Sequence, residues 1–317
     1  MGKTKILICS SEVGAGKRGA SLGPDAIRIE AVNQFFNIFD RLPSEEVKVS
    51  ALNKYTPETK QAKYIKQIVS THGKISSKMC KAHKEGYNTI IFSGDHSNAA
   101  GFFNGFREAY PTAKLGLIWI DAHGDLHSPY TSPSGNVHGM PVSILLGLDN
   151  LKYQRNNLKP EVKKNWEKIK KMGSLEISPK LNPEDIIFID IRDLEKEEWA
   201  LIEELQIKHY TPAIRREIGV QKIIEETIAY FKDYDGMYIS FDVDSMDPSI
   251  STGTGTPVPD GLKRHEAAEL LKAFVNMKNF KSLEITEVNP LLDTENKMAY
   301  AVVKILKDAL NEDILTS

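Results

Sequence analysis

The sequence is poor in cysteine and has no long apolar run. Its 317 residues include only Cys9 and Cys80, which argues against a disulfide framework, and no C-x-x-C pair supports a cysteine metal site. No apolar stretch approaches the roughly 18 residues that a membrane span requires. The short apolar run near the start is too brief for the core of a signal peptide. We therefore expect a cytoplasmic protein with no membrane partner.

An excess of charge of either sign is also missing. The 41 lysines and arginines nearly balance the 43 aspartates and glutamates, leaving a net charge of −2. Such a chain lacks the positive field that a nucleic-acid partner requires. What the chain does have is an ordinary globular composition, 41% hydrophobic and 26% charged, with enough apolar material for a sizeable core. Because nothing marks a linker or an internal repeat, we predict a single domain over residues 1–317.

Strand-like and helix-like segments alternate along the whole chain. The predicted strands are residues 5–9, 47–51, 88–93, 114–120, 186–191, 236–241 and 283–286. Helical patterns separate them, including a long stretch over 57–85 that we expect to be interrupted near His72 and Gly73. This alternation predicts an α/β fold with a mostly parallel sheet covered on both faces.

Four polar, metal-capable side chains follow the predicted strand 114–120 at every second position. They are Asp121, His123, Asp125 and His127. If the backbone stays extended, all four lie on one face. Two carboxylates and two imidazoles can bind a divalent cation such as Mn or Zn. A surface loop could carry the same residues by chance, so the neighbouring segments must decide.

Polar clusters also follow three other predicted strands. His96 follows 88–93, Asp242 and Asp244 end 236–241, and Glu287 ends the strand at 283–286. Taken singly, each could be a helix cap or a turn residue. In open parallel sheets, however, ligands bind beyond the carboxyl ends of the strands. We therefore expect all four segments to converge on one rim of the sheet.

The converging segments supply four carboxylates and two imidazoles. These six candidate metal ligands are His96, Asp121, His123, Asp125, Asp242 and Asp244. The set is large enough for two divalent ions roughly 3.5–4 Å apart, an arrangement that binds and ionises a water between them. A single ion would leave three of the acids close together without countercharge, which raises their pKa. The sequence therefore predicts a hydrolase with two metal ions.

These residues lie in motifs that resemble the signature blocks of the ureohydrolase family. The blocks are SGDHS (93–97), DAHGD (121–125), SGNVHG (134–139), SFDVDSMDP (240–248) with GTGTPV (253–258), and EVNP (287–290). They occur in the family order, and SGNVHGMPVS is similar to the arginase branch. The resemblance implies a three-layer α/β/α fold around an eight-stranded parallel sheet. It also implies a homo-oligomer, a trimer or hexamer.

The same resemblance implies the chemistry. Arginase-like proteins hold two Mn²⁺ ions and hydrolyse L-arginine to L-ornithine and urea, with a metal-bridging hydroxide attacking the guanidinium carbon. The same ligands also accept Co, Fe or Zn. By motif, one ion would be bound by His96, Asp121, Asp125 and Asp242, and the other by Asp121, His123, Asp242 and Asp244.

The resemblance also assigns roles around the ions. Asp125 would pass a proton to the departing amine, and His138 resembles the family's proton shuttle. Glu287 resembles the acid that binds the guanidinium, since a carboxylate can accept two parallel N–H bonds from that planar group. Thr256 would steady this end of the substrate.

The substrate's α-amino acid end is where the chain departs from the family pattern. Ser134 and Asn136 match, but Glu195 stands in place of an aspartate and His127 in place of an asparagine. His127 could still donate an N–H to the substrate carboxylate. Alternatively, the two changes retune the pocket toward agmatine, another guanidino acid or formiminoglutamate, or His127 supports the metal ligands. A catalytically silent homologue is a further alternative, although no ligand is missing.

Two further features are expected to have no chemical role. The loop containing Gly14, Gly16, Gly19 and Gly23 lacks the Walker A spacing, so we predict a flexible loop at the sheet edge. We expect surface or boundary positions for the remaining histidines, His72, His83, His209 and His265.

Overall fold

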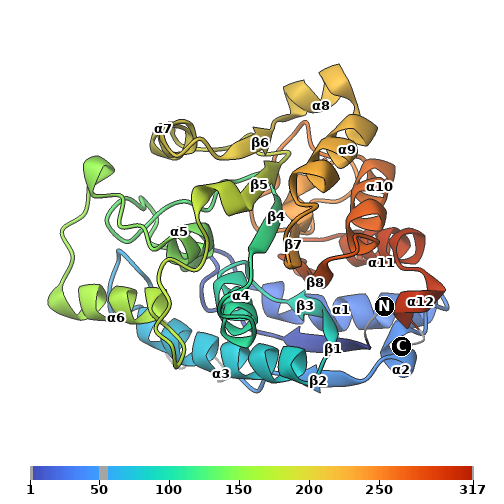
Figure 1. Cartoon of the computed structure of the whole chain (residues 1–317), viewed down its shortest axis with the longest axis horizontal. Coiled ribbons are helices and arrows are strands. Elements are labelled where there is room, and N and C mark those ends of the chain that lie inside the picture. The colour runs from blue at the N-terminus through green and yellow to red at the C-terminus, as the bar shows by residue number, and fades with distance from the viewer. Residues whose placement is uncertain (1–2, 50–55, 316–317) are drawn as a thin grey trace.

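The computed structural model describes residues 3–49 and 56–315, which build one eight-stranded sheet (Figure 1). The strand order is β2-β1-β3-β8-β7-β4-β5-β6, and every pair is parallel. The strands are β1 (Thr4–Cys9), β2 (Ser44–Glu46), β3 (Asn88–Ser93), β4 (Leu115–Ile120), β5 (Ile186–Ile189), β6 (Lys208–Tyr210), β7 (Gly236–Asp242) and β8 (Phe280–Thr286).

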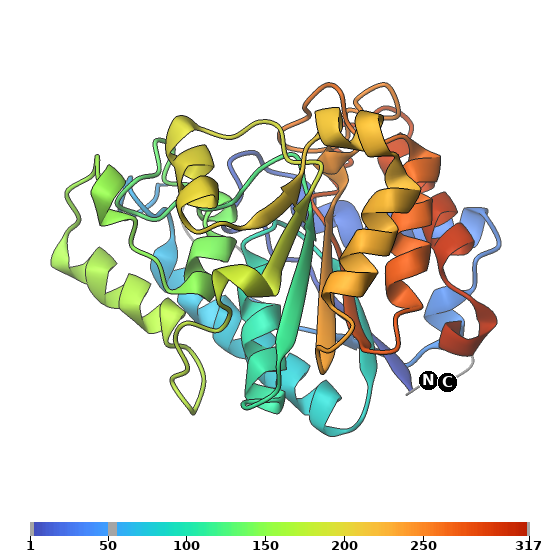
Figure 2. The same cartoon turned by 45° about the horizontal axis from the view of Figure 1, so that its top comes forward.

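Helices cover both faces of the sheet (Figure 2). Their buried side chains and those of the strands form two hydrophobic cores. One core includes α3 (Ile65–Lys84), α4 (Asn98–Ala109), α5 (Pro141–Leu146), α6 (Pro160–Lys170) and α7 (Lys196–Glu204). The other includes α1 (Gly23–Asn33), α2 (Ile38–Arg41), α8 (Pro212–Ile218), α9 (Val220–Tyr230), α10 (Arg264–Val275), α11 (Lys297–Ala309) and α12 (Glu312–Leu315). The predicted three-layer α/β/α fold is confirmed. Within the described residues, no helix is both long and apolar enough to cross a membrane.

The central strands read as continuous apolar runs because both of their faces are covered. Every residue of β3 and β4 is buried. Successive side chains enter opposite cores: in β4, Ile118 and Ile120 join one core, whereas Leu117 and Trp119 join the other. These runs were therefore recognisable as strands in the sequence, and they place the middle of the sheet correctly.

The edge strands differ from the prediction. The strand expected at 47–51 is wrong: β2 lies at Ser44–Glu46, residues 47–49 are not strand, and positions 50 and 51 fall outside the described residues. The three-residue strand β6 was not predicted. Both edges are short and partly exposed, so neither carries the apolar run by which a central strand is recognised.

Helix α3 is continuous, so the predicted interruption near His72 is wrong. Two glycines of α4 allow α3 to pack closely: a Cβ on Gly101 would lie 3.1 Å from the His72 Cα, and one on Gly105 would lie 2.3 Å from the Ser76 carbonyl oxygen. His72 and, further along the helix, His83 are buried, contrary to the expected surface or boundary positions. Burial lowers the pKa of both imidazoles to about 3.

Candidate metal centre and active site

Four neighbouring strands deliver the candidate ligands to one rim of the sheet. His96 lies just beyond β3, Asp121 directly follows β4, Asp242 ends β7, and Glu287 directly follows β8. These strands are adjacent in the order β3-β8-β7-β4 and all run parallel. Their carboxyl ends therefore meet, and the structure brings the four polar segments together.

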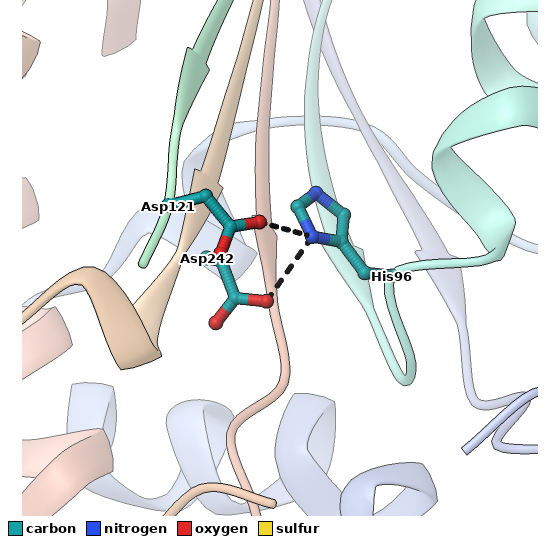
Figure 3. A group of neighbouring side chains, drawn as sticks. All are labelled: His96, Asp121 and Asp242. Carbon is teal, nitrogen blue, oxygen red and sulfur yellow. Dashed lines mark ion pairs between the residues drawn. The ribbon is translucent and has the colours of Figure 1, made fainter. Parts of the chain in front are cut away.

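The first candidate cation group consists of His96, Asp121 and Asp242 (Figure 3). The Nδ1 atom of His96 lies 3.0 Å from Oδ2 of Asp121 and 3.1 Å from Oδ2 of Asp242. Oδ2 of Asp125 approaches the same nitrogen to 3.4 Å. All four side chains are buried. One imidazole nitrogen and three carboxylate oxygens thus surround one small volume.

A second candidate cation group lies beside the first and consists of Asp121, His123 and Asp244. The Nδ1 atom of His123 lies 3.1 Å from Oδ2 of Asp244 and 3.4 Å from Oδ1 of Asp121. Asp121 therefore offers one oxygen to each group. The arrangement supplies two adjacent cation positions that share a carboxylate.

The nitrogen and oxygen atoms of these two groups are better suited to binding divalent cations than to pairing with one another. Within the described residues, the ion-pair partners of these four aspartates are His96 and His123, with no lysine or arginine among them. Burial, together with repulsion between neighbouring carboxylates, raises the pKa of Asp125 and Asp242 well above the usual range. Nδ1 of His96 and Oδ2 of Asp121 are buried without a hydrogen-bond partner. A cation would satisfy both atoms and remove the repulsion.

Both groups open into a cleft of about 360 Å³. Five of the residues predicted around the substrate line it: His127, Ser134, His138, Glu195 and Thr256. The cleft is lined mainly by polar and ionisable side chains. Two divalent cations would balance the charges of the four aspartates at the inner end of this cleft.

Glu287 pairs with His138, which lines the cleft, but Glu287 itself is buried and is not part of the cleft lining. Oε1 of Glu287 accepts a hydrogen bond of 2.9 Å from the backbone N–H of His96 and lies 3.3 Å from Nδ1 of His138. Burial alone would lower the pKa of His138, but the hydrogen bond and charge of Glu287 raise it to about 9. The same pairing lowers the pKa of the buried Glu287. An imidazolium beside a carboxylate is a competent proton donor at neutral pH.

Comparison with known proteins decides the family. The sequence pattern of the Arginase family matches residues 5–311. This chain belongs to the arginase family. It is 34% identical to an arginase of Staphylococcus aureus strain COL, over 99% of this chain and 100% of that protein. It is 31% identical to an arginase of Bacillus subtilis strain 168, over 96% of each chain. The solved arginase of Bacillus caldovelox superimposes with a TM-score of 0.84 at 30% identity, covering 98% of this chain and 99% of the other.

His127 lies apart from both cation groups. The extended conformation predicted for 121–127 is wrong: residues 121–123 form bends, and Asp125 has a left-handed φ of 48°. The turn brings Asp125 toward His96 but turns His127 outward. Its Nε2 lies 3.5 Å from Oε2 of Glu198 and 3.9 Å from Oε1 of Glu195. The residue that replaces the family asparagine therefore faces acids at the cleft mouth.

Glu195, the other departure from the arginase-family pattern, begins α7 as its N-cap. Its carboxylate lies 3.3 Å from the guanidinium of Arg155, which also pairs with Glu197. Glu198, one turn into α7, accepts hydrogen bonds from the backbone N–H groups of Leu126 and Glu195. These contacts tie α7 to the metal-bearing loop.

The loop SGNVHG (residues 134–139) is held in place by contacts with Lys63 and the glycine loop. Nζ of Lys63 donates a 2.8 Å hydrogen bond to Oδ1 of Asn136, and the carbonyl of Gly14 accepts the backbone N–H of His138. A Cβ on Gly16 would lie 2.6 Å from Nδ2 of Asn136. The glycine loop, predicted to be a flexible loop at the sheet edge, therefore packs against the SGNVHG loop, and a side chain at Gly16 would displace Asn136.

Thr256 supports the metal centre. Its hydroxyl donates a 3.0 Å hydrogen bond to Oδ2 of Asp244. A Cβ on the preceding Gly255 would lie 3.7 Å from Oε2 of Glu287. Thr256 thus steadies a carboxylate of the second cation group and also lines the cleft, and its role at the guanidinium end of the substrate stays a prediction.

Sequence reasoning missed the residues behind His96. Nε2 of His96 lies 2.8 Å from the hydroxyl of Ser240, which donates to Glu284, as does the hydroxyl of Tyr238. The indole of Trp119 stacks on the imidazole, with ring centroids 3.9 Å apart. These contacts fix the ring so that Nδ1 points at the acids. The available signal was a glutamate within the apolar strand SLEIT, because a buried carboxylate requires polar partners.

Proposed function

We propose that this chain is a metal-dependent amidinohydrolase that hydrolyses L-arginine to L-ornithine and urea. The observation that carries the proposal is the pair of cation groups sharing Asp121, beside a cleft that is also lined by His138, the partner of the buried Glu287. Relatives named arginase over nearly the whole chain support it. The entire chain, residues 1–317, would serve as one catalytic domain.

Two Mn²⁺ ions are the proposed cofactor, and Co, Fe or Zn could occupy the same ligands. One ion would be held by His96, Asp121, Asp125 and Asp242, and the other by Asp121, His123, Asp242 and Asp244. Bound there, the ions would supply a nucleophile made from water at neutral pH and stabilise negative charge in the transition state.

The chain's own residues would orient the substrate and move protons. Glu287 accepts two parallel N–H bonds from the guanidinium and holds its carbon above the cation groups. Asp125 takes a proton from the attacking water and passes it toward the amine that departs. His138, charged through its contact with Glu287, supplies a second proton to that amine, so that the side-chain amine of ornithine leaves as an ammonium.

The outer end of the cleft would recognise the α-amino acid group. Ser134, Asn136 and His127 donate hydrogen bonds to the substrate carboxylate. Glu195 accepts from the α-ammonium, directly or through a water. This arrangement favours arginine over agmatine, which has no carboxylate.

We also propose that the protein is a cytoplasmic homo-oligomer, a trimer or hexamer. Apolar side chains are exposed together on and just after α1: Ile29, Val32 and Phe35, the last 94% exposed. Clustered exposed apolar side chains mark association surfaces. Light scattering on the purified protein measures the mass, and a monomer would contradict this proposal.

The decisive assay compares substrates on one metal-analysed sample. Mn-loaded protein should release urea from arginine faster than from agmatine or guanidinobutyrate, with formiminoglutamate assayed by its own amide product. Release of urea from agmatine but not from arginine would refute arginine as the substrate, while the assignment of the reaction class would stand. Turnover of none of the four would favour a silent binding or regulatory homologue.

Substituting His127→Asn restores the family asparagine and should lower the KM for arginine or leave it little changed. The reason is that either side chain can donate an N–H to the substrate carboxylate. Steady-state urea release measures the effect, with Glu195→Asp and the double variant as matched controls. A loss of more than about tenfold in kcat/KM, worth about 1.4 kcal/mol, would assign His127 a role of its own beside Glu198.

Substituting His138→Asn should lower kcat about 10²-fold, a typical contribution of one acid–base group. KM should change little, because Glu287 remains. In the wild type, His138 must be protonated to donate, so the rate should fall as pH rises through its pKa, which the bound cations move downward from about 9. The variant should lack this fall. Identical pH profiles of kcat would rule out His138 as the donor.

A further inference from the structure

Arg192 uses every N–H group of its guanidinium inside the protein. Nε donates to the carbonyl of Pro259 at 2.9 Å. Nη1 donates to the carbonyl and the carboxylate of Asp190 at 2.9 and 3.0 Å. Nη2 donates to the carbonyls of Asp244 and Val258, each at 2.9 Å. The five donors of a guanidinium are held in a fixed fork, so this side chain, 8% exposed, locks three segments in one geometry.

Two of those segments form the outer half of the metal centre. Asp244 belongs to the second cation group, and its carboxylate accepts hydrogen bonds from the backbone N–H of Ala122 and the hydroxyl of Thr256. Val258 and Pro259 follow Thr256 on the same loop. Arg192 therefore joins the turn that presents Asp244 to the loop that braces its carboxylate.

The backbone of Arg192 also makes a contact next to the second cation group. The N–H groups of Arg192 and Asp193 both donate to the carbonyl of Ala122, at 2.8 and 3.0 Å. Ala122 lies between Asp121 and His123, the other two members of that group. Arg192 thus makes a backbone hydrogen bond to Ala122, between the candidate ligands Asp121 and His123. Its side chain makes a hydrogen bond to the third ligand of the group, Asp244.

Neighbouring residues form a site that accommodates the guanidinium of Arg192. Nε of Arg215 donates to the second carboxylate oxygen of Asp190 at 2.7 Å, and Glu266 pairs with Arg215 in turn. Gly261 leaves room, since a Cβ there would lie 2.7 Å from Nη2 of Arg192. Asp190 and Arg215 therefore fix the guanidinium of Arg192 on one side, while its hydrogen bond to the carbonyl of Asp244 lies on the side of the metal centre.

We propose that Arg192 is a positioning residue that determines the affinity of the second cation group, Asp121, His123 and Asp244. It touches neither ion nor substrate, and its side chain acts through the carbonyl of Asp244 and the loop at Val258 and Pro259. The backbone hydrogen bond to Ala122 is kept by any residue at this position. The first group should be spared, because His96 has its own support from Ser240 and Trp119. This inference rests on the proposed two-ion function.

The test compares Arg192→Met and Arg192→Lys with Arg216→Met. Arg216 pairs with Asp260 near the same loop but is exposed and has no contact with Asp244, so it is the matched control. Chelator-competition titration with Mn²⁺, without substrate, measures the affinity of each ion. In both Arg192 variants we expect one ion bound as in the wild type and the other bound about 10- to 100-fold more weakly, the usual cost of losing outer support of a ligand.

The melting temperature of the metal-free protein separates positioning from general stability. A purely structural role would lower it and weaken both ions equally, and that result would overturn the inference. So would wild-type affinity for both ions in a folded Arg192 variant. If Arg192→Met does not fold, Arg192→Lys, which keeps the charge but cannot bridge the three segments, decides alone. Fewer than two ions in the wild type would instead refute the two-ion proposal itself.

Discussion

Substituting Asp121→Asn should lower kcat for arginine by about 10³-fold or more, because this carboxylate offers one oxygen to each cation group. Asparagine has one neutral oxygen, and its amide nitrogen would face an ion. The loss therefore reaches both ions, and electrostatic stabilisation of the transition state by such a centre is worth at least this much. Urea release measures the rate, and metal analysis of the same sample should show fewer ions than in the wild type.

Asp185→Asn provides the control for Asp121→Asn. Asp185 is also a buried aspartate, but it caps a turn through the backbone N–H of Asn182, away from the cleft. Its substitution should affect thermal stability and leave urea release unchanged. If Asp121→Asn kept two ions and a wild-type rate, the shared-carboxylate arrangement would be wrong.

Substituting Glu287→Gln should lower kcat/KM for arginine about 10²- to 10³-fold while leaving the bound ions in place. Glu287 is outside both cation groups, so metal analysis should match the wild type. Removing one partner of a buried charged pair costs about 2–5 kcal/mol, and each 1.4 kcal/mol is a factor of ten. The guanidinium would lose its carboxylate, and His138 would lose the contact that raises its pKa.

Glu30→Gln is the matched control for the glutamate substitution. Glu30 is buried in α1 and accepts hydrogen bonds from Asn33 and Gln34, remote from the strand ends that form the site. This variant should keep the wild-type kcat/KM. Unchanged kinetics in Glu287→Gln would refute its assignment to the guanidinium, and loss of ions from it would assign it to the metal centre instead.

The middle of the fold could be predicted from the sequence, whereas its edges could not. Strands such as β3 and β4 are buried on both faces and therefore appear as unbroken apolar runs. The edge strands β2 and β6 are held by pairing on one side only and carry no such run. Similarly, Gly73 suggested a break in α3, but packing against α4 outweighs the roughly 1 kcal/mol that a helical glycine costs.

The candidate ligands could also be found from the sequence, because each polar cluster immediately follows an apolar run and parallel strands end on the same side. The conformation between them could not. Alternation suggested that His127 lies beside Asp125, but the left-handed φ of Asp125 sends the two side chains in different directions. The φ angle of Asp125 alone determines the relative direction of these two side chains, and the periodicity of the sequence does not indicate that angle.

The sequence by itself thus determined the layered α/β architecture, the arginase-family motifs and the identity of the six candidate ligands, since apolar runs and residue chemistry are local properties. Only the tertiary structure decided which atoms share a cation position, which acids face His127, and how Ser240 and Arg192 support the ligands. The physical reason is that these are contacts between segments far apart in the chain. Their hydrogen-bond distances depend on how the strands and loops pack together, and therefore on the whole fold.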